Sequence, residues 1–282
     1  AGALALRIWD PSSVARLRAL VFDTYQEISP RQFDPDLPLR IVDIDEESLK
    51  RIGQWPWPRT ILAELVRKLS DDGAAAIGFD IVFPEPDRLS PANALRFWPQ
   101  SKALAGLRAE VEKLPSNDQV LAEAIGKGPV VLGFIATPQA GSIPQSKAGF
   151  AQTGDDPRLF APAYSGAAVS LPELQEKALG TGSLNWLPEH DQIIRRVPMV
   201  VQVGGKLYSS FAADMLRLAQ GASTYIVKSS GASSEKAFGE HTGIVKIRIG
   251  DYEVPTEADG QMWIRFTKHA KQRYLPAWRV LN

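Results

Sequence analysis

Acidic side chains gather after two short hydrophobic runs, where their oxygens can act as ligands or as charge partners. Five carboxylates form this group: Asp43, Asp45, Asp80, Glu85 and Asp87. Oxygen ligands bind divalent cations, and Asp43, Asp45 and Asp80 are the set that would do so here. The spacing lacks the glycine and terminal glutamate of a calcium loop. Carboxylates at strand ends also cap helices or pair with arginines such as Arg59 and Arg88, so we favour structural pairing over a metal site.

An aromatic loop lies beside these acids in the sequence. It reads GQWPWPR (53–59), in which Trp55 and Trp57 each precede a proline that restricts them to an extended backbone. Two indoles, an arginine and nearby carboxylates suit a small-ligand pocket with aromatic walls and polar anchors. Tryptophans next to prolines more often cover a hydrophobic core, and we favour that role. The candidate ligand-binding residues are Asp43, Asp45, Trp55, Trp57, Arg59, Asp80, Glu85 and Asp87.

Two strands and a helix must position these groups. Residues 39–45 predict a buried strand, and residues 74–83 predict a second strand that is apolar at nearly every position. Between them, residues 60–72 place apolar side chains at three- and four-residue steps, which predicts an amphipathic helix. We therefore expect a right-handed βαβ unit with adjacent parallel strands. Asp45 and Asp80 would then lie at one carboxyl edge, where open α/β sheets bind ligands.

The rest of the chain continues an α/β pattern and then becomes richer in short strands. We expect Ser116 to cap a helix that runs to Ile125, followed by a strand at 129–136 and a surface loop at 137–163. From residue 224 onward, short strands and tight turns predict a mixed or antiparallel sheet. The predicted fold class is α/β: a three-layer-like mixed sheet that opens with a βαβ unit and is more antiparallel toward its C-terminal part.

Two segments in the middle of the chain also carry expectations. A helix after residue 210 is expected to bury Phe211, Met215 and Leu218. The adjacent Arg195 and Arg196 precede a strand, where they would either hold an anionic ligand against the acidic edge or neutralise that edge. Charge balance favours neutralisation.

The N-terminal segment predicts a helix that begins at Asp10-Pro11. One face of this helix carries Val14, Leu17, Val21 and Tyr25. Two roles stay open for it: the helix extends a membrane span or packs along a partner chain, or it simply covers the sheet. We expect residues 1–38 to be a membrane-proximal helix and connector, and residues 39–282 to be the folded domain.

Composition excludes several function classes. The 282 residues are 44% hydrophobic, enough for a large core. With 32 basic and 32 acidic residues the net charge is zero, so the total implies no nucleic-acid partner. The absence of cysteine removes disulfides and thiolate chemistry. His190, His241 and His269 lie apart, and neither a GxSxG motif nor a phosphate-loop spacing occurs, so we expect no cofactor and no catalytic residue.

Several motifs together resemble one family. They are IVDIDEESLKRIGQWPWPRTILAEL (41–65), GAAAIGFDIVFPEPDR (73–88), FDTYQEISPR (22–31), GSLNWLPEHDQIIRRVPMVV (182–201) and residues 254–281. The sequence resembles, over nearly its whole length, a CHASE domain of the second type (CHASE2), the extracytoplasmic sensory module of bacterial receptors. It departs from the usual family pattern at residues 188–190 and at the inserted-looking residues 90–114.

The resemblance implies a periplasmic or extracytoplasmic part of an inner-membrane receptor, tied to the membrane by flanking helices and ending near the next one. These motifs are most similar to those of CHASE2 domains attached to class III adenylate/guanylate cyclases. A histidine kinase or a serine/threonine kinase is the alternative output. The signal would be an unknown small molecule or protein, and the full receptor a homodimer. The residues alone also leave a carbohydrate-active enzyme open, with Asp43 and Asp45 as its carboxylate pair beside tryptophan platforms.

Overall fold

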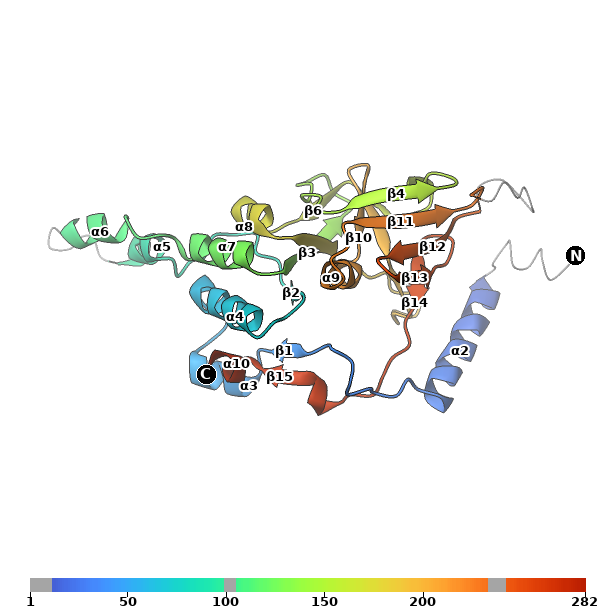
Figure 1. The fold of residues 1–282 in the computed structure, drawn as a ribbon, viewed down its shortest axis with the longest axis horizontal. Helices are drawn as coiled ribbons and strands as arrows, with labels where there is room; N and C mark the ends of the chain where they lie inside the picture. Colours follow the sequence, from blue (N-terminus) through green and yellow to red (C-terminus); the bar gives the residue numbers. More distant parts are fainter. Residues whose placement is uncertain (1–11, 99–104, 233–241) are drawn as a thin grey trace, which may run out of the picture.

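The computed structural model describes residues 12–98, 105–232 and 242–282. Its helices are α2 (Ser12–Ile28), α3 (Glu46–Ile52), α4 (Arg59–Asp71), α5 (Pro91–Ala94), α6 (Ala105–Val111), α7 (Asn117–Lys127), α8 (Pro172–Lys177), α9 (Phe211–Ala219) and α10 (Ala277–Leu281). Helices α5 and α6 extend from one end of the molecule, and α2 lies at the opposite end (Figure 1). Within the described residues, no helix is both long and apolar enough to cross a membrane.

In the described parts of the chain the strands form five small sheets. In sheet order they are β2 (Ile77–Phe79), β3 (Val130–Thr137) and β6 (Gly166–Ala168), with β7 (Gly180–Ser183) also on β3; β10 (Lys206–Ser209), β9 (Val200–Val203) and β5 (Ala163–Tyr164); β13 (Tyr252–Pro255), β12 (Ile244–Ile249), β11 (Thr224–Ser229) and β4 (Gly149–Thr153); β14 (Gln261–Trp263) with β8 (Arg196–Pro198); and β1 (Ile41–Asp43) with β15 (Tyr274–Pro276). Parallel and antiparallel pairs occur together, so the mixed α/β prediction is confirmed.

Local sequence signals account for several of these elements. Helix α4 matches the predicted stripe, because Leu62, Leu65 and Val66 are buried on one side of it. Ser116 begins α7 with a reciprocal capping box: its side chain accepts a hydrogen bond from the backbone N–H of Gln119, and the Gln119 side-chain oxygen accepts one from the Ser116 N–H. The predicted strand at 129–136 is confirmed as β3, and β9 and β10 form a hairpin.

The main hydrophobic core lies between α4, α7 and the sheet of β2 and β3. Trp57, Leu62, Phe83, Leu121 and Ile125 are its largest buried members, each no more than 1% exposed. Burying an aromatic or aliphatic side chain of this size contributes roughly 1.5–3 kcal/mol. A second core under β11 and β12 and a third around β3 and β9 complete the interior.

The predicted βαβ unit is wrong. Strand β1 pairs in parallel with β15, from Ile41 opposite Tyr274 to Asp43 opposite Pro276, whereas β2 pairs in parallel with β3. Strand β1 is also not buried on both faces, since Ile41 and Asp43 are exposed. The partner of β1 comes from near the opposite end of the sequence, and a hydrophobic run carries no information about so distant a partner.

Two further predictions need correction. The expected loop at 137–163 contains β4, which pairs in parallel with β11; its sequence GFAQT is mostly exposed and lacks an apolar run. Helix α9 buries Ala213, Asp214 and Arg217 instead of Phe211, Met215 and Leu218, which are only half-buried. A charged pair replaces the expected apolar face because Asp214 and Arg217 satisfy each other in the interior, with Arg217 Nε donating to Asp214 Oδ1 at 2.7 Å.

Some predictions fall partly outside the described residues. The helix start at Asp10-Pro11 lies there, as do residues 99–104 of the inserted-looking segment 90–114. His241 also lies there.

Candidate functional site

The structure separates the five carboxylates that the sequence analysis grouped. Asp45 caps α3, with Oδ1 accepting from the Ser48 N–H at 2.8 Å, and hydrogen bonds from Ser48 lower the pKa of that carboxyl. Asp43, Asp80 and Glu85 are exposed, and β1, which ends at Asp43, lies in a different sheet from β2, which Asp80 follows. Among the described residues, no three histidine or acidic side chains are placed to hold a metal ion. The predicted acidic edge is therefore wrong.

Asp87 and Arg59 do meet, in a buried polar group that we call the polar clasp (Arg59, Asp87, Asn117 and Asp118). The Asp87 carboxylate accepts from the Arg59 N–H, the Leu89 N–H and Asn117 Nδ2, each at 2.8 Å. Asp118 Oδ2 accepts from the Asp87 N–H at 2.8 Å, and Asp118 Oδ1 lies 3.5 Å from Arg59 Nε. The clasp joins the N-termini of α4 and α7 to the proline-rich turn that follows β2. Its carboxylates lie at the helix N-termini, where the helix dipole favours negative charge.

The aromatic loop of residues 53–59 contributes Trp57 to the main hydrophobic core. Trp57 is 1% exposed and donates from Nε1 to the Gly53 carbonyl at 2.7 Å. Trp55 is half-buried and meets Trp57 edge to face, with ring centroids 5.9 Å apart. The Arg59 guanidinium lies 4.2 Å from the Phe83 ring centroid. The favoured structural role of this loop agrees with these contacts; ligand binding by its residues stays a prediction.

A second polar group joins α2 to the body of the domain. Arg195 is 3% exposed at its side chain and donates to both oxygens of Asp23, at 2.7 and 2.6 Å. Beside it, the Phe22 ring lies 4.6 Å from the Trp263 ring, and Gln26 Nε2 donates to the Ile264 carbonyl at 2.7 Å. We call these three contacts the α2 tether. Sequence reasoning missed Asp23 and Trp263 as partners, although Asp23 lies inside the motif FDTYQEISPR.

Carboxylates surround Arg195 on its other side. Arg195 also pairs with Asp191 at 2.8 Å and Glu189 at 3.2 Å, and Arg196 pairs with Glu189 at 3.1 Å. Hydrogen bonds from Arg195 lower the pKa of Asp191 from 3.8 to about 2, and the hydrogen bonds that Arg195 donates to Asp23 and Asp191 raise the pKa of Arg195. The arginines are therefore neutralised by the protein's own acids, as charge balance favoured, although these acids are not the ones predicted at the sheet edge.

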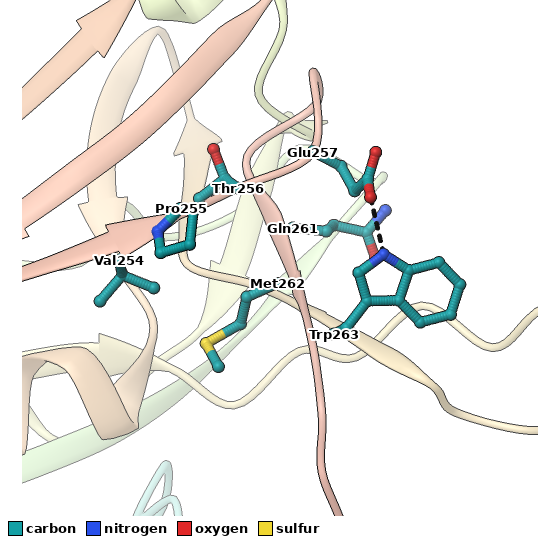
Figure 2. Close-up of a pocket in the computed structure, with 7 residues that line it drawn as sticks. All are labelled: Val254, Pro255, Thr256, Glu257, Gln261, Met262 and Trp263. Atoms are coloured by element: carbon teal, nitrogen blue, oxygen red, sulfur yellow. Dashed lines mark hydrogen bonds between the residues drawn. The ribbon is translucent and has the colours of Figure 1, made fainter. Parts of the chain in front are cut away.

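A hollow of about 270 Å³ lies against Trp263 (Figure 2). Its lining residues are Val254, Pro255, Thr256, Glu257, Gln261, Met262 and Trp263, and we call it the tryptophan pocket. Trp263 Nε1 donates to Glu257 Oε1 at 2.6 Å, which fixes the indole at one side (Figure 2). The Arg196 guanidinium lies 5.1 Å from the same ring. One side chain, Trp263, thus borders the pocket and contacts α2.

Comparison of the sequence with models of protein families identifies its family. The model of the CHASE2 domain matches residues 1–282. This chain belongs to the CHASE2 family. CHASE2 domains are extracytoplasmic, sensory and not catalytic. No curated protein and no solved structure matches the chain.

Removing the carboxylate at the centre of the polar clasp should destabilise this CHASE2 domain. Asp87→Ala leaves the buried Asn117 Nδ2 and two partly buried backbone N–H groups without an acceptor, so we expect the free energy of unfolding to fall by about 2–4 kcal/mol. Glu85→Ala, in the same turn but exposed, is the matched control and should change it by less than about 0.5 kcal/mol. Urea denaturation measures both; equal effects would contradict the clasp.

Breaking the α2 tether should release α2 from the CHASE2 body. Arg195→Gln removes both hydrogen bonds to Asp23, so amide hydrogen exchange in α2 should speed up by about tenfold or more. Lys246→Gln, which breaks the exposed Lys246–Glu253 pair, should leave α2 exchange unchanged. Hydrogen–deuterium exchange by mass spectrometry reports the result, and unchanged exchange in Arg195→Gln would contradict the tether.

The free energy of unfolding should depend on pH through the Asp191–Arg195 pair, and urea denaturation at a series of pH values measures it. Pairing lowers the Asp191 pKa from 3.8 to about 2, so the stabilisation from the Asp191–Arg195 pair is complete above pH 3.8 and is lost as the pH falls through about 2.

Proposed function

We propose that this CHASE2 domain is the periplasmic, ligand-sensing part of an inner-membrane receptor that regulates a cytoplasmic class III adenylate/guanylate cyclase. Membership of an extracytoplasmic sensory family supports the sensing role. The proposal of a cyclase output rests on the resemblance of two sequence motifs, residues 22–31 and 53–59, to those of cyclase-linked CHASE2 domains. The single observation that carries the mechanism is the position of Trp263, which borders the tryptophan pocket and contacts Phe22 of α2.

In this mechanism α2 is the moving part. A ligand that favours one orientation of Trp263 changes its contact with Phe22, which is a ring pair of the kind that contributes about 0.5–1.5 kcal/mol. Only a difference in affinity between two positions of α2 shifts their populations, and about 1.4 kcal/mol changes their ratio tenfold. The tether is small enough for such a difference to act on it, since it consists of one ion-paired arginine, one ring contact and one side-chain hydrogen bond.

We further propose that the receptor is a homodimer in which α2 pairs with α2 of a second copy. The residues that face the body are Ala19, Phe22, Asp23 and Gln26. At 3.6 residues per turn the opposite face carries Leu17, Leu20, Val21, Tyr25 and Ile28, each at least 47% exposed. By the same spacing the charged residues of α2 lie outside this face, with Arg18 bordering it on one side and Glu27 on the other. Leu17, Val21 and Ile28 are four and seven residues apart, the spacing of a helix-pairing seam in which Thr24 takes the intervening position.

Cyclic nucleotide production by the intact receptor in membranes tests the proposed function. Trp263→Ala should change the formation of cyclic AMP or cyclic GMP by at least about threefold, because it removes the ring contact with α2. Trp186→Ala, at a tryptophan that is 52% exposed, is the control and should not change it. Phosphorylation of protein instead of cyclic nucleotide formation would transfer the proposal to a kinase.

Orientation in the membrane is tested in the same protein. The chain has no cysteine, so Glu85→Cys gives a single exposed thiol in this domain. A membrane-impermeant maleimide should label it in intact spheroplasts. Labelling only after lysis would refute an external domain.

Disulfide cross-linking tests the α2 pair. In membranes containing the intact receptor, Val21→Cys should form covalent dimers under mild oxidation, because the two copies of this face are in contact. Arg16→Cys lies on the same helix but off the apolar face and should cross-link far more slowly. The unsubstituted receptor measures the background. Equal rates for the two variants would contradict pairing through this face.

A further inference from the structure

The connector after α2 and the segment after β14 run side by side. Arg31 and Thr267 form a parallel bridge between them, and farther along the same two segments pair again as β1 and β15. Figure 1 shows the blue connector and the red segment following one path below the sheets. Between the two pairing points the segments enclose a hollow of about 260 Å³, which we call the arginine pocket.

Positive charge dominates the arginine pocket. Arg31, Arg265 and Arg273 line it, and Asp34 is its only acidic lining residue. Three cations against one anion leave an excess of two positive charges. Within the described residues, no ion pair or side-chain hydrogen bond engages Arg31 or Arg265, so both guanidinium groups have their donors available. The Asp34 carboxylate accepts from the Asp36 N–H at 3.0 Å, and in the part of the chain that the structure describes it forms no ion pair with these arginines.

The third arginine is already fixed in place. Arg273 Nη2 donates to Thr267 Oγ1 at 2.8 Å, and its guanidinium lies 5.1 Å from the Phe33 ring centroid. A guanidinium held in this way keeps further donors for an anion without a large loss of conformational freedom. It also spans the two segments, because Phe33 belongs to the connector and Arg273 to the returning segment.

Apolar side chains form most of the remaining wall, beside the polar Gln32 and Thr267: Phe33, Leu37, Leu39, Ile264 and Phe266. Binding sites of this composition orient a ligand with a few polar groups and bury its apolar part against the wall. The volume lies just below the range of drug-sized pockets, roughly 300–1,000 Å³, so the fitting ligand is small. Guanidinium groups select carboxylates and phosphates, which they bind through two parallel hydrogen bonds.

We propose that the arginine pocket binds a small soluble organic anion, with a carboxylate or phosphate held by Arg31 and Arg265 and an apolar or aromatic part against Phe33 and Phe266. Such a ligand crosslinks the connector to the returning segment. Arg31 follows α2 by three residues, and Arg265 follows Trp263 by two, so occupancy reaches both sides of the α2 tether. Anion binding stands by itself; its role as the signal rests on the proposed function.

Calorimetric titration of the 282-residue chain with benzoate and with phenyl phosphate tests the binding and separates the two anion chemistries. Benzyl alcohol is the neutral analogue of the same ring. We expect at least one of the two anions to bind at least about tenfold more tightly than benzyl alcohol, with affinity that falls as salt is added. The absence of binding by both anions would overturn the proposal, as would equal binding of the alcohol.

Charge-matched variants locate the site. Arg31→Gln and Arg265→Gln should each weaken binding by about tenfold, whereas Arg67→Gln, at an exposed arginine of α4, should not. Both test positions are exposed, and circular dichroism checks their folding. As a second readout, the bound anion should slow amide exchange in residues 31–39 and 264–273; protection elsewhere would refute the location.

Two further arms separate the anion's source and its role. If the protein sediments with phosphatidylglycerol vesicles but binds neither phenyl phosphate nor benzoate, the ligand is a lipid headgroup and the proposal of a soluble anion is refuted. Anion binding that leaves cyclic nucleotide formation unchanged would remove only the signalling role. If Trp263→Ala alters that formation while neither anion binds, the proposed function stands and the arginine pocket does not.

Discussion

The parallel pairing of β1 with β15 determines where the two ends of the domain lie. Residues near opposite ends of the sequence exchange backbone hydrogen bonds there, from Ile41 opposite Tyr274 onward. The contacts continue beyond the strands: the Trp278 N–H donates to Ser48 Oγ at 3.1 Å, and the Arg51 guanidinium lies 4.0 Å from the Trp278 ring. Because this pairing holds the connector against the returning segment, the arginine pocket and the approach to the α2 tether both depend on it.

Burial of charge explains why α2 has a defined position at all. A guanidinium taken out of water requires acceptors, since an unpaired buried cation costs several kcal/mol. Arg195 meets this requirement with Asp191 and Glu189 from its own loop and with Asp23 from α2. The acids of its own loop keep Arg195 charged and ordered even when Asp23 moves away. If α2 moved away, Arg195 would still be paired with Asp191 and Glu189, so the movement would not leave an unpaired buried charge. This arrangement suits a helix that changes position.

Local patterns in the sequence predicted local structure well. The stripe of α4, the capping box of α7 and the hairpin after Val203 follow from short-range spacing. Pairing between distant segments was not predictable in this way, and the acidic edge failed because it depended on β1 and β2 being neighbours. The motifs nevertheless contained the partners. WPWPR and FPEPDR meet through Arg59 and Asp87, and the motif at 22–31 meets the one at 182–201 through Asp23 and Arg195.

The direction of the β1–β15 pair has a mechanical consequence. In a parallel pair, the start of one strand and the end of the other lie at opposite ends of the ladder. A pull between α2 and the residues that follow β15 therefore loads the hydrogen bonds along the strands, in shear, so that they resist together instead of opening one after another. The β1–β15 pair would then carry the tension in place of the rest of the domain. The strain would fall on the connector and on α2, which only the three contacts of the α2 tether hold to the domain among those described above.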